Sequence, residues 1–169
     1  MYLYRMSGPV EFSAAAAIDR NEGWELLSAE HVDWLLEIGP FDVSDGLLRL
    51  QRGDCCYTVR LDGRLAHYSW VQRSGLHPIT EAGRSVLVGG GEFWIYHCRT
   101  AEWARGKGIY PATLERIVRD HFESGYSTAW IYTTQENFAS QRGILRAGFG
   151  LQTTFTAIRL GNRYYRLGK

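Results

Sequence analysis

Residues 105–110 read RGKGIY, and they lie where a strand-like run gives way to a helix-like run. The apolar stretch 93–98 precedes this glycine loop, and the stretch 109–122, which has helical spacing, follows it. Glycine permits a tight turn and a close approach of a ligand to the main chain. The helix that follows begins with unpaired N–H groups and a partial positive charge. With Arg105 and Lys107 beside them, these features are typical of a phosphate-binding loop.

A second segment further along the chain strengthens this interpretation. It consists of the strand-like run 129–134, then Asn137 and Ser140, and then the sequence AGF at 147–149. The chain contains neither the GxxxxGK pattern of a Walker loop nor the GxGxxG dinucleotide fingerprint. Most isolated glycine-rich loops are plain turns, and Lys107 can equally be a solvated loop lysine, so the inference needs both segments.

The bulk properties favour one ordinary domain. A chain of 169 residues is most simply a single domain, and its net charge of +1 gives no electrostatic reason to expect nucleic acid or a membrane surface as a partner. Its three cysteines, at 55, 56 and 98, fit neither a disulfide framework nor a zinc site, so we expect reduced thiols and a cytoplasmic protein. The apolar run 14–18 is too short for a signal peptide or a membrane span.

The order of the predicted elements indicates a mixed α/β sheet, because helices come first, then a β-hairpin, then a β-α-β-α-β series. An Asp-Gly pair between two strand-like runs is a strong hairpin signal. The predicted elements are an opening strand 2–6, helices 29–38 and 44–52, strands 55–61 and 65–72 around the turn 62–63, a loop 73–91 with a short strand 85–88, a strand 92–100, a helix 109–123, a strand 128–134, a helix 137–147, and strands 149–160 and 163–167 around 161–162.

These residues resemble the GNAT superfamily of acyl-coenzyme A transferases. The family's loop pattern (Arg/Gln)-x-x-Gly-x-(Gly/Ala) is matched by Arg105 and Gly108, but Tyr110 replaces the last small residue and would crowd the loop. The family's later pattern Asn-x-x-(Ala/Ser), which ends on Gly-Phe, is matched from Asn137 to Phe149. The resemblance covers about residues 50–160. It implies an α/β fold with a mixed, mostly antiparallel sheet, splayed central strands and helices on both faces.

The resemblance also implies a single domain over residues 1–169, with N-terminal helices on the acceptor side in 1–53 and the sheet and acyl-CoA core in 54–169. The co-substrate would be acetyl-CoA or another acyl-CoA, and a small-molecule or peptide amine would attack it directly, with no metal. Main-chain groups of the glycine loop would bind the diphosphate, and main-chain groups of the strand that contains residues 97–100 would bind the pantetheine arm. The expected cofactor-binding residues are His97, Cys98, Arg99, Thr100, Arg105, Gly106, Lys107, Gly108, Ile109, Tyr110, Asn137 and Ser140.

The catalytic assignment is less direct. In many family members a tyrosine on the last motif's helix reprotonates the departing thiolate, and the matching position here is Ile144. Strand alternation places Glu92, Trp94, Tyr96 and Cys98 on one face unless a bulge reverses it. We therefore expect Glu92 or Tyr96 to act as a base through water. His97 would point the other way, and Cys98 is more simply a packing residue than a nucleophile.

Trp94 and Tyr132 stand where the family often carries a carboxylate base, and Tyr132 is a candidate proton donor to the thiolate. Equally, Tyr132 can be a core residue and Glu92 a solvated strand end. Five acidic residues in segment 20–50 suit a cationic amine, although a solvated helix face explains them as well, and they are Glu22, Glu25, Glu30, Asp33 and Glu37. Two alternatives remain, namely a GNAT-shaped module that binds acyl-CoA or an acyl carrier protein without turnover, and an interaction domain without a cofactor. A homodimer is compatible with each of these.

Overall fold

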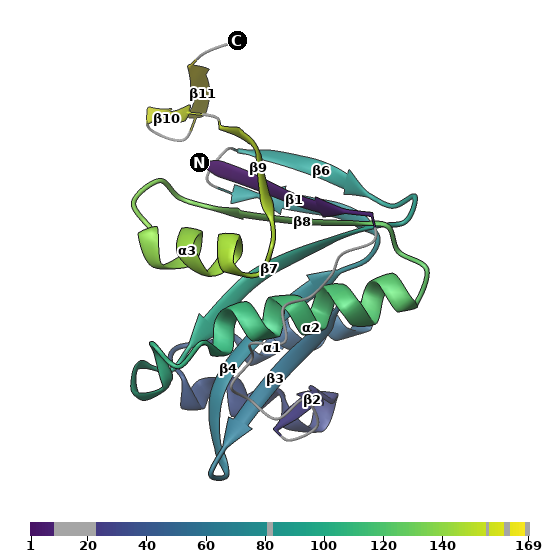
Figure 1. Ribbon diagram of the computed structural model, residues 1–169, viewed down its shortest axis with the longest axis vertical. Coiled ribbons are helices and arrows are strands. Elements are labelled where there is room, and N and C mark those ends of the chain that lie inside the picture. Colours follow the sequence, from purple (N-terminus) through teal and green to yellow (C-terminus); the bar gives the residue numbers. More distant parts are fainter. Residues whose placement is uncertain (9–22, 81–82, 155, 161–162, 168–169) are drawn as a thin grey trace.

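A seven-stranded sheet forms the centre of the protein (Figure 1). The computed structural model describes residues 1–8, 23–80, 83–154, 156–160 and 163–167. Neighbouring strands run antiparallel except for β7 and β8, so the predicted mixed, mostly antiparallel α/β sheet is confirmed. In spatial order the strands are β2 (Trp24–Leu26), β3 (Cys55–Leu61), β4 (Arg64–Gln72), β7 (Glu92–Thr100), β8 (Thr128–Thr133), β1 (Tyr2–Ser7) and β9 (Gly150–Thr154).

Helices cover both faces of this sheet, as expected. The helices α2 (Ile109–Glu123) and α3 (Phe138–Arg146) pack on one face, around a buried cluster that includes Phe93 and Leu114. The 3-10 helix η1 (Ala29–Glu37) and the helix α1 (Val43–Gln51) pack on the other, around Trp70. None of the helices in the described residues is both long enough and apolar enough to span a bilayer.

Local sequence signals explain where several elements begin and turn. The Asp42 carboxylate accepts hydrogen bonds from the amides of Ser44 and Asp45 and so caps α1, and Asn137 caps α3 in the same way. Asp62 and Gly63 both have positive φ angles, 50° and 74°, which the predicted β3–β4 hairpin turn requires.

Some predicted elements differ from the structure. Segment 29–38 forms a 3-10 helix and not an α-helix. The expected loop 73–91 contains a whole hairpin of β5 (Gly75–Ile79) and β6 (Arg84–Val88). The sequence did not predict β5 because this strand contains a glycine and a proline, which are uncommon inside strands. The last predicted strands form β9 and a separate hairpin of β10 (Thr156–Leu160) and β11 (Arg163–Leu167), whose turn at 161–162 lies outside the described residues.

The central strands part, as predicted. β7 pairs with β8 in parallel only from Glu92 to Ile95. Beyond Ile95, β7 continues along β4 as far as Thr100, while β8 ends at Thr133 without pairing to it. The short 3-10 helix η3 (Glu102–Ala104) then leads from β7 into the glycine loop. The main chain of β7 on this side is therefore open to another partner.

A β-bulge changes the direction of the side chains in this open part of β7. The register with β4 shifts between Tyr68 and Trp70, and His97 adopts a positive φ of 47°. As a result Tyr96 and His97 both pack on the α1 face, whereas Cys98 packs against the cluster beneath α2. The expected alternation of side chains is therefore wrong beyond Tyr96. His97 lies on the same face of the sheet as Tyr96, and Cys98 lies on the opposite face.

Candidate functional site

A groove of about 570 Å³ lies at the start of α2, between the open end of β7 and α3. Gly106 and Gly108 have φ angles of 76° and 75°, in the region that favours glycine, and they turn the chain so that α2 begins at Ile109. Among the residues that the structure describes, none accepts a hydrogen bond from the main-chain amides of Gly106 to Tyr110. These amides and the positive end of the helix are available to an anion.

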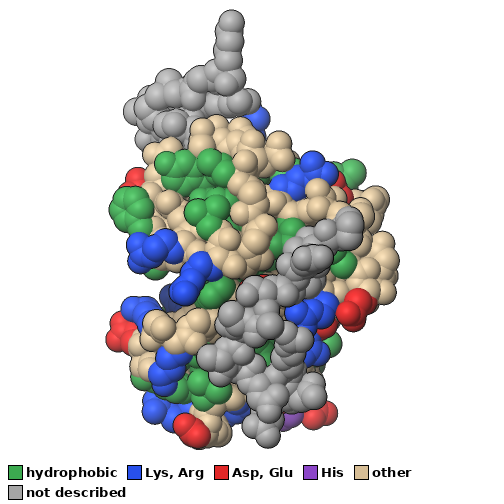
Figure 2. Space-filling view, viewed as in Figure 1, with side chains coloured by type: hydrophobic (Ala, Val, Ile, Leu, Met, Phe, Trp, Pro, Cys, Tyr) green, Lys and Arg blue, Asp and Glu red, His purple; other side chains and the backbone are tan. Residues whose placement is uncertain are grey.

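Four arginines line the groove, and none of its lining residues is acidic. Arg105 comes from the glycine loop and Arg142 and Arg146 from α3, whereas Arg99 comes from β7 and donates through Nη1 to the carbonyl of Pro40 at 3.2 Å. Arg105 has one carboxylate neighbour, Glu102, at 3.5 Å, and both side chains are well exposed, so this ion pair restrains it little. Figure 2 shows Lys and Arg side chains on both sides of the hollow between α3 and the start of α2. The groove is thus suited to a ligand with several negative charges.

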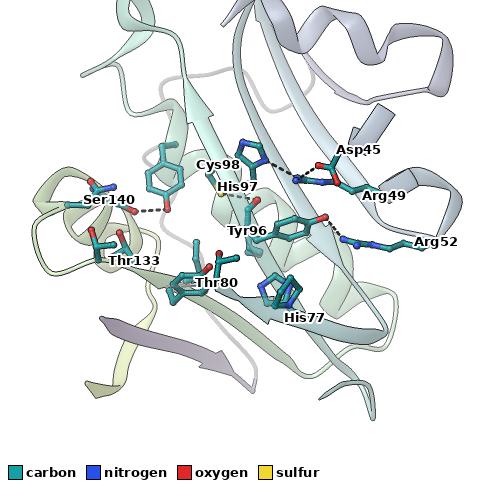
Figure 3. Close-up of a pocket in the computed structure, with 17 residues that line it drawn as sticks. Asp45, Arg49, Arg52, His77, Thr80, Tyr96, His97, Cys98, Thr133 and Ser140 are labelled. Carbon is teal, nitrogen blue, oxygen red and sulfur yellow. Dashed lines mark hydrogen bonds and ion pairs between the residues drawn. The ribbon is translucent and has the colours of Figure 1, made fainter. Parts of the chain in front are cut away.

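A second cavity, of about 550 Å³, opens where β7 and β8 part, and we call it the splay cavity. Its wall combines residues of α1, of the β5–β6 hairpin and of the separating ends of β7 and β8 (Figure 3). Cys98, Tyr110, Asn137 and Ser140 line both the groove and the splay cavity. A ligand that enters along the groove therefore reaches the splay cavity at these four residues.

The α1 wall of the splay cavity is charged. Arg49 contacts Asp45 Oδ2 at 2.5 Å through Nη2, and its Nη1 donates to His97 Nδ1 at 2.8 Å (Figure 3). Its guanidinium also lies over the rings of Trp70 and Tyr96, at 5.2 and 5.1 Å from their centroids. Burial and the positive charge of Arg49 lower the pKa of His97 to about 4, so its imidazole is neutral at neutral pH.

Tyr96 is held by a buried carboxylate. Its hydroxyl donates to Asp54 Oδ2 and accepts from Arg52 Nη2 at 2.9 Å. The Asp54 side chain is only 2% exposed, and Arg52 also binds it through Nε at 2.9 Å. Burial, helped by the bond to Asp54, raises the pKa of Tyr96. The phenol therefore stays protonated, and its proton points toward Asp54.

The structure separates the predicted catalytic residues. Tyr96 and Tyr132 line the splay cavity. Glu92 lines neither cavity, because it pairs with Thr128 at the other end of β7. The expected role of Glu92 as a base through water therefore has no support in this geometry.

The sequence reasoning missed four ionisable residues of the splay cavity. His77 on β5 is buried, stacks on Trp94 and donates through Nδ1 to Gln72 Oε1 at 2.9 Å, which leaves Nε2 as its acceptor nitrogen. The other three, at positions 45, 49 and 52, lie on one face of α1. Their i, i+4, i+7 spacing was the signal that could have identified them.

Most predicted cofactor-binding residues do line the groove. They are Cys98, Arg99, Thr100, Arg105, Gly106, Gly108, Ile109, Tyr110, Asn137 and Ser140. His97 lies in the splay cavity instead, and Lys107 lines neither cavity, because its Nζ lies over the Trp103 ring at 5.1 Å. Burial raises the pKa of the Cys98 thiol to about 12, so it is a poor nucleophile at neutral pH.

Tyr110 does not crowd the glycine loop, contrary to expectation. Its ring crosses from α2 to α3 and packs on Gly143, where an added Cβ would lie 2.4 Å from Tyr110 Cδ1. Its hydroxyl lies 3.2 Å from Ser140 Oγ. The bulky side chain therefore forms the wall between the groove and the splay cavity.

Within the described part of the chain, no three His, Cys, Asp or Glu side chains are placed to hold a metal ion.

No protein-family model and no curated protein matches the sequence. Several solved structures are similar in fold. An acetyltransferase assigned to the GNAT family from Novosphingobium aromaticivorans is 20% identical with a TM-score of 0.60, and the match covers 89% of this chain and 60% of that chain. This chain thus spans 60% of the Novosphingobium protein.

Two shorter relatives are similar over most of their length. The ribosomal-protein-S18-alanine N-acetyltransferase from Escherichia coli is 14% identical with a TM-score of 0.62, and the match covers 78% of this chain and 79% of that chain. An aminoglycoside N-acetyltransferase in complex with CoA is 16% identical with a TM-score of 0.60, over 83% and 98% of the two chains. With the parted central strands and the loop at the start of α2, these likenesses show that the chain has the GNAT superfamily fold.

Proposed function

We propose that this protein is an acyl-CoA-dependent N-acyltransferase that uses acetyl-CoA as the donor and an amine as the acceptor. One observation carries the proposal: the groove beside the unpaired amides of the glycine loop meets the splay cavity where β7 and β8 part. The CoA bound to the aminoglycoside N-acetyltransferase of the same fold supports the same ligand here. An amine in the splay cavity would attack a thioester that arrives along the groove.

The groove fits coenzyme A in both charge and shape. The amides of the glycine loop and Arg105 would hold the diphosphate, and Arg142 and Arg146 favour a ligand with further phosphate charge. The unpaired main chain of β7 beyond Ile95 offers hydrogen bonds to the amides of the pantetheine arm. The coenzyme supplies an activated acyl group, and the protein must orient the amine and accept its proton.

We assign the acceptor side to the splay cavity. Part of the N-terminal region lines it through α1, which agrees with an acceptor role for those helices in one domain. Tyr96 offers its oxygen to an amine N–H while its own proton points toward Asp54, so this pair can take up a proton without forming a free phenolate. Tyr132 stays the candidate proton donor to the leaving thiolate, since it lines the same cavity.

Calorimetry with acetyl-CoA tests the binding step. The double variant Arg105→Glu, Gly108→Trp reverses the charge of the loop and fills its left-handed turn. We expect its affinity to fall about tenfold or more, because one charge-assisted hydrogen bond is worth about 1.5–3 kcal/mol. Gly63→Trp is the matched control for the bulky residue: Gly63 has nearly the same φ, 74°, and an added Cβ at either glycine meets nothing within 4 Å. No binding by the parent, or equal binding by the double variant, defeats the proposal.

A binding module without turnover is the second candidate. Two observations favour it: Ile144 is fully buried at the position of the family's catalytic tyrosine, and Glu92 lies away from the cavities. Thiol release from acetyl-CoA across a panel of amines separates the two functions. Binding without release would identify a module for acyl-CoA or for the related arm of an acyl carrier protein.

A further inference from the structure

The acidic residues that suggested a cationic acceptor do not reach the splay cavity. Glu25, Glu30, Asp33 and Glu37 line neither the groove nor the splay cavity, and Glu22 lies outside the described residues. Glu37 instead binds Arg60 at 3.1 Å and the amide of Leu65 at 2.9 Å. The charge of the acceptor side is therefore set by α1.

Two arginines face the splay cavity from α1 and its C-cap, and each is paired with one carboxylate, Arg49 with Asp45 and Arg52 with Asp54. Asp45 is half exposed and contacts Arg49, whose side chain is only 14% exposed and is fixed between aromatic rings. Such a stacked guanidinium keeps a fixed orientation, so it loses little conformational entropy on binding an anion. Figure 3 shows Arg49 and Arg52 reaching from α1 toward the residues of β7.

Both arginines retain N–H groups for a ligand. Arg52 directs Nε and Nη2 toward Asp54 and Tyr96, and within the described residues no acceptor is paired with its Nη1. Arg49 uses one proton of Nη1 for His97 and one of Nη2 for Asp45, so each nitrogen keeps a second N–H. Two guanidinium groups in one cavity, each with an N–H to spare, can both donate to a carboxylate.

His97 is one of the titratable groups in the wall of this cavity. After burial, Arg49 and Arg99 are what lower the pKa of His97, and only Asp45 acts in the opposite direction. Arg49 is paired with Asp45 and Arg52 with Asp54, so the two charges of each pair balance, and the N–H groups left over on both guanidinium groups are what an anion would meet.

We propose that the splay cavity binds an acceptor that carries a carboxylate near its reactive amine, and that Arg49 and Arg52 hold this carboxylate. The inference rests on the proposed function, because it names the acceptor class of the same reaction. A free amino acid and a peptide whose first residue is acidic both present this chemistry. The carboxylate would fix the acceptor so that its amine lies near Tyr96 and the junction with the groove.

The test compares acceptors that differ only in this charge. Protein saturated with CoA is titrated with amino acids and with their primary amides, and with dipeptides that begin with Asp or Glu against those that begin with Asn or Gln. We expect the carboxylates to bind about 10- to 100-fold more tightly than their amides, the range for loss of a charge-assisted contact. Preference among the free amino acids identifies a metabolite acceptor, and preference confined to acidic dipeptides identifies a peptide acceptor.

Variants assign the preference to the two arginines. Arg49→Gln should remove most of the preference for carboxylates, because the variant lacks the guanidinium that would hold them. The variant should still fold, because the partner Asp45 is half exposed and can be hydrated. Arg52→Lys keeps a positive charge beside the buried Asp54 but loses Nη1, so it should weaken the preference and leave the fold intact. Arg60→Gln is the matched control: Arg60 also lies over a tryptophan ring and pairs with a carboxylate, but it lines neither cavity.

The outcomes separate this inference from the proposed function. If acetyl-CoA binds and the amides bind as well as the carboxylates, the acceptor class is wrong and the acyltransferase proposal stands. A carboxylate preference that survives Arg49→Gln and Arg52→Lys together also overturns the assignment. If acetyl-CoA itself fails to bind, the proposed function fails, whatever the acceptor titrations show.

Discussion

The contact between Tyr110 and Gly143 predicts an unusual change of sign in a mutational cycle. Gly143 lies inside α3, where alanine is ordinarily better than glycine by about 1 kcal/mol. In this protein, however, the new methyl carbon would lie 2.4 Å from Tyr110 Cδ1 and 2.8 Å from Cε1, and the ring is held between α2 and α3. Overpacking of this kind costs about 1–3 kcal/mol. The Gly143→Ala variant should therefore lose up to about 2 kcal/mol of its free energy of unfolding.

The clash disappears when the ring is removed. In a Tyr110→Ala background, Gly143→Ala should instead raise the free energy of unfolding by about 1 kcal/mol, the helix propensity alone. The coupling energy of the cycle is then about 1–3 kcal/mol, measured by urea unfolding of the parent, the two single variants and the double variant. Equal effects of Gly143→Ala in the two backgrounds would refute the close contact. Gly46→Ala is a control in which the new methyl group would clash with Val32 and Phe41 instead, so its effect should not depend on Tyr110.

Three further predictions concern charge and titration. Burial lowers the pKa of His67 to about 3 from 6.5, so below pH 6.5 the unfolded chain binds a proton that the native protein does not. The free energy of unfolding should therefore fall by about 1.4 kcal/mol per pH unit below pH 6. Urea melts at pH 7 and pH 5 should show a smaller fall for His67→Gln than for the parent protein. Acetyl-CoA should bind several-fold more weakly in calorimetry when the ionic strength rises from about 0.05 to 0.5 M, because Arg105, Arg142 and Arg146 of the groove are exposed to solvent, and dephospho-CoA should be less sensitive to salt. Cys98→Ala should keep its thiol-release activity if the amine attacks directly, whereas complete loss in a variant that still binds acetyl-CoA would indicate a covalent intermediate.

Much of the fold could be predicted because its signals are local. Asp62-Gly63 specifies a turn through its own φ angles, Asn137 caps its own helix, and the glycine loop has its left-handed residues where the sequence placed them. Apolar periodicity similarly identified α2 and the strands beside it.

The site was only partly predictable because its key features arise between distant segments. The bulge at His97 depends on how β7 registers against β4, and nothing in the local sequence marks it. The fit of Tyr110 against Gly143 joins two helices, so the sequence alone made the tyrosine look like a misfit in the loop. The lining of the splay cavity was missed for a similar reason, because acidity counted along a segment does not show which side chains face inward, and the structure places Asp45, Arg49 and Arg52 there.

The position of β1 has a consequence for how the molecule is made. Tyr2–Ser7 is inserted between β8 and β9, so this strand has no partners in the sheet until residues 128–154, which are synthesised much later than it is. Until then, this half of the sheet cannot close. Deletion of Tyr2–Ser7 would remove the main-chain hydrogen-bond partners of β8 and β9 at once and leave two unpaired strand edges. The first effect of such a deletion should therefore be aggregation of newly made protein.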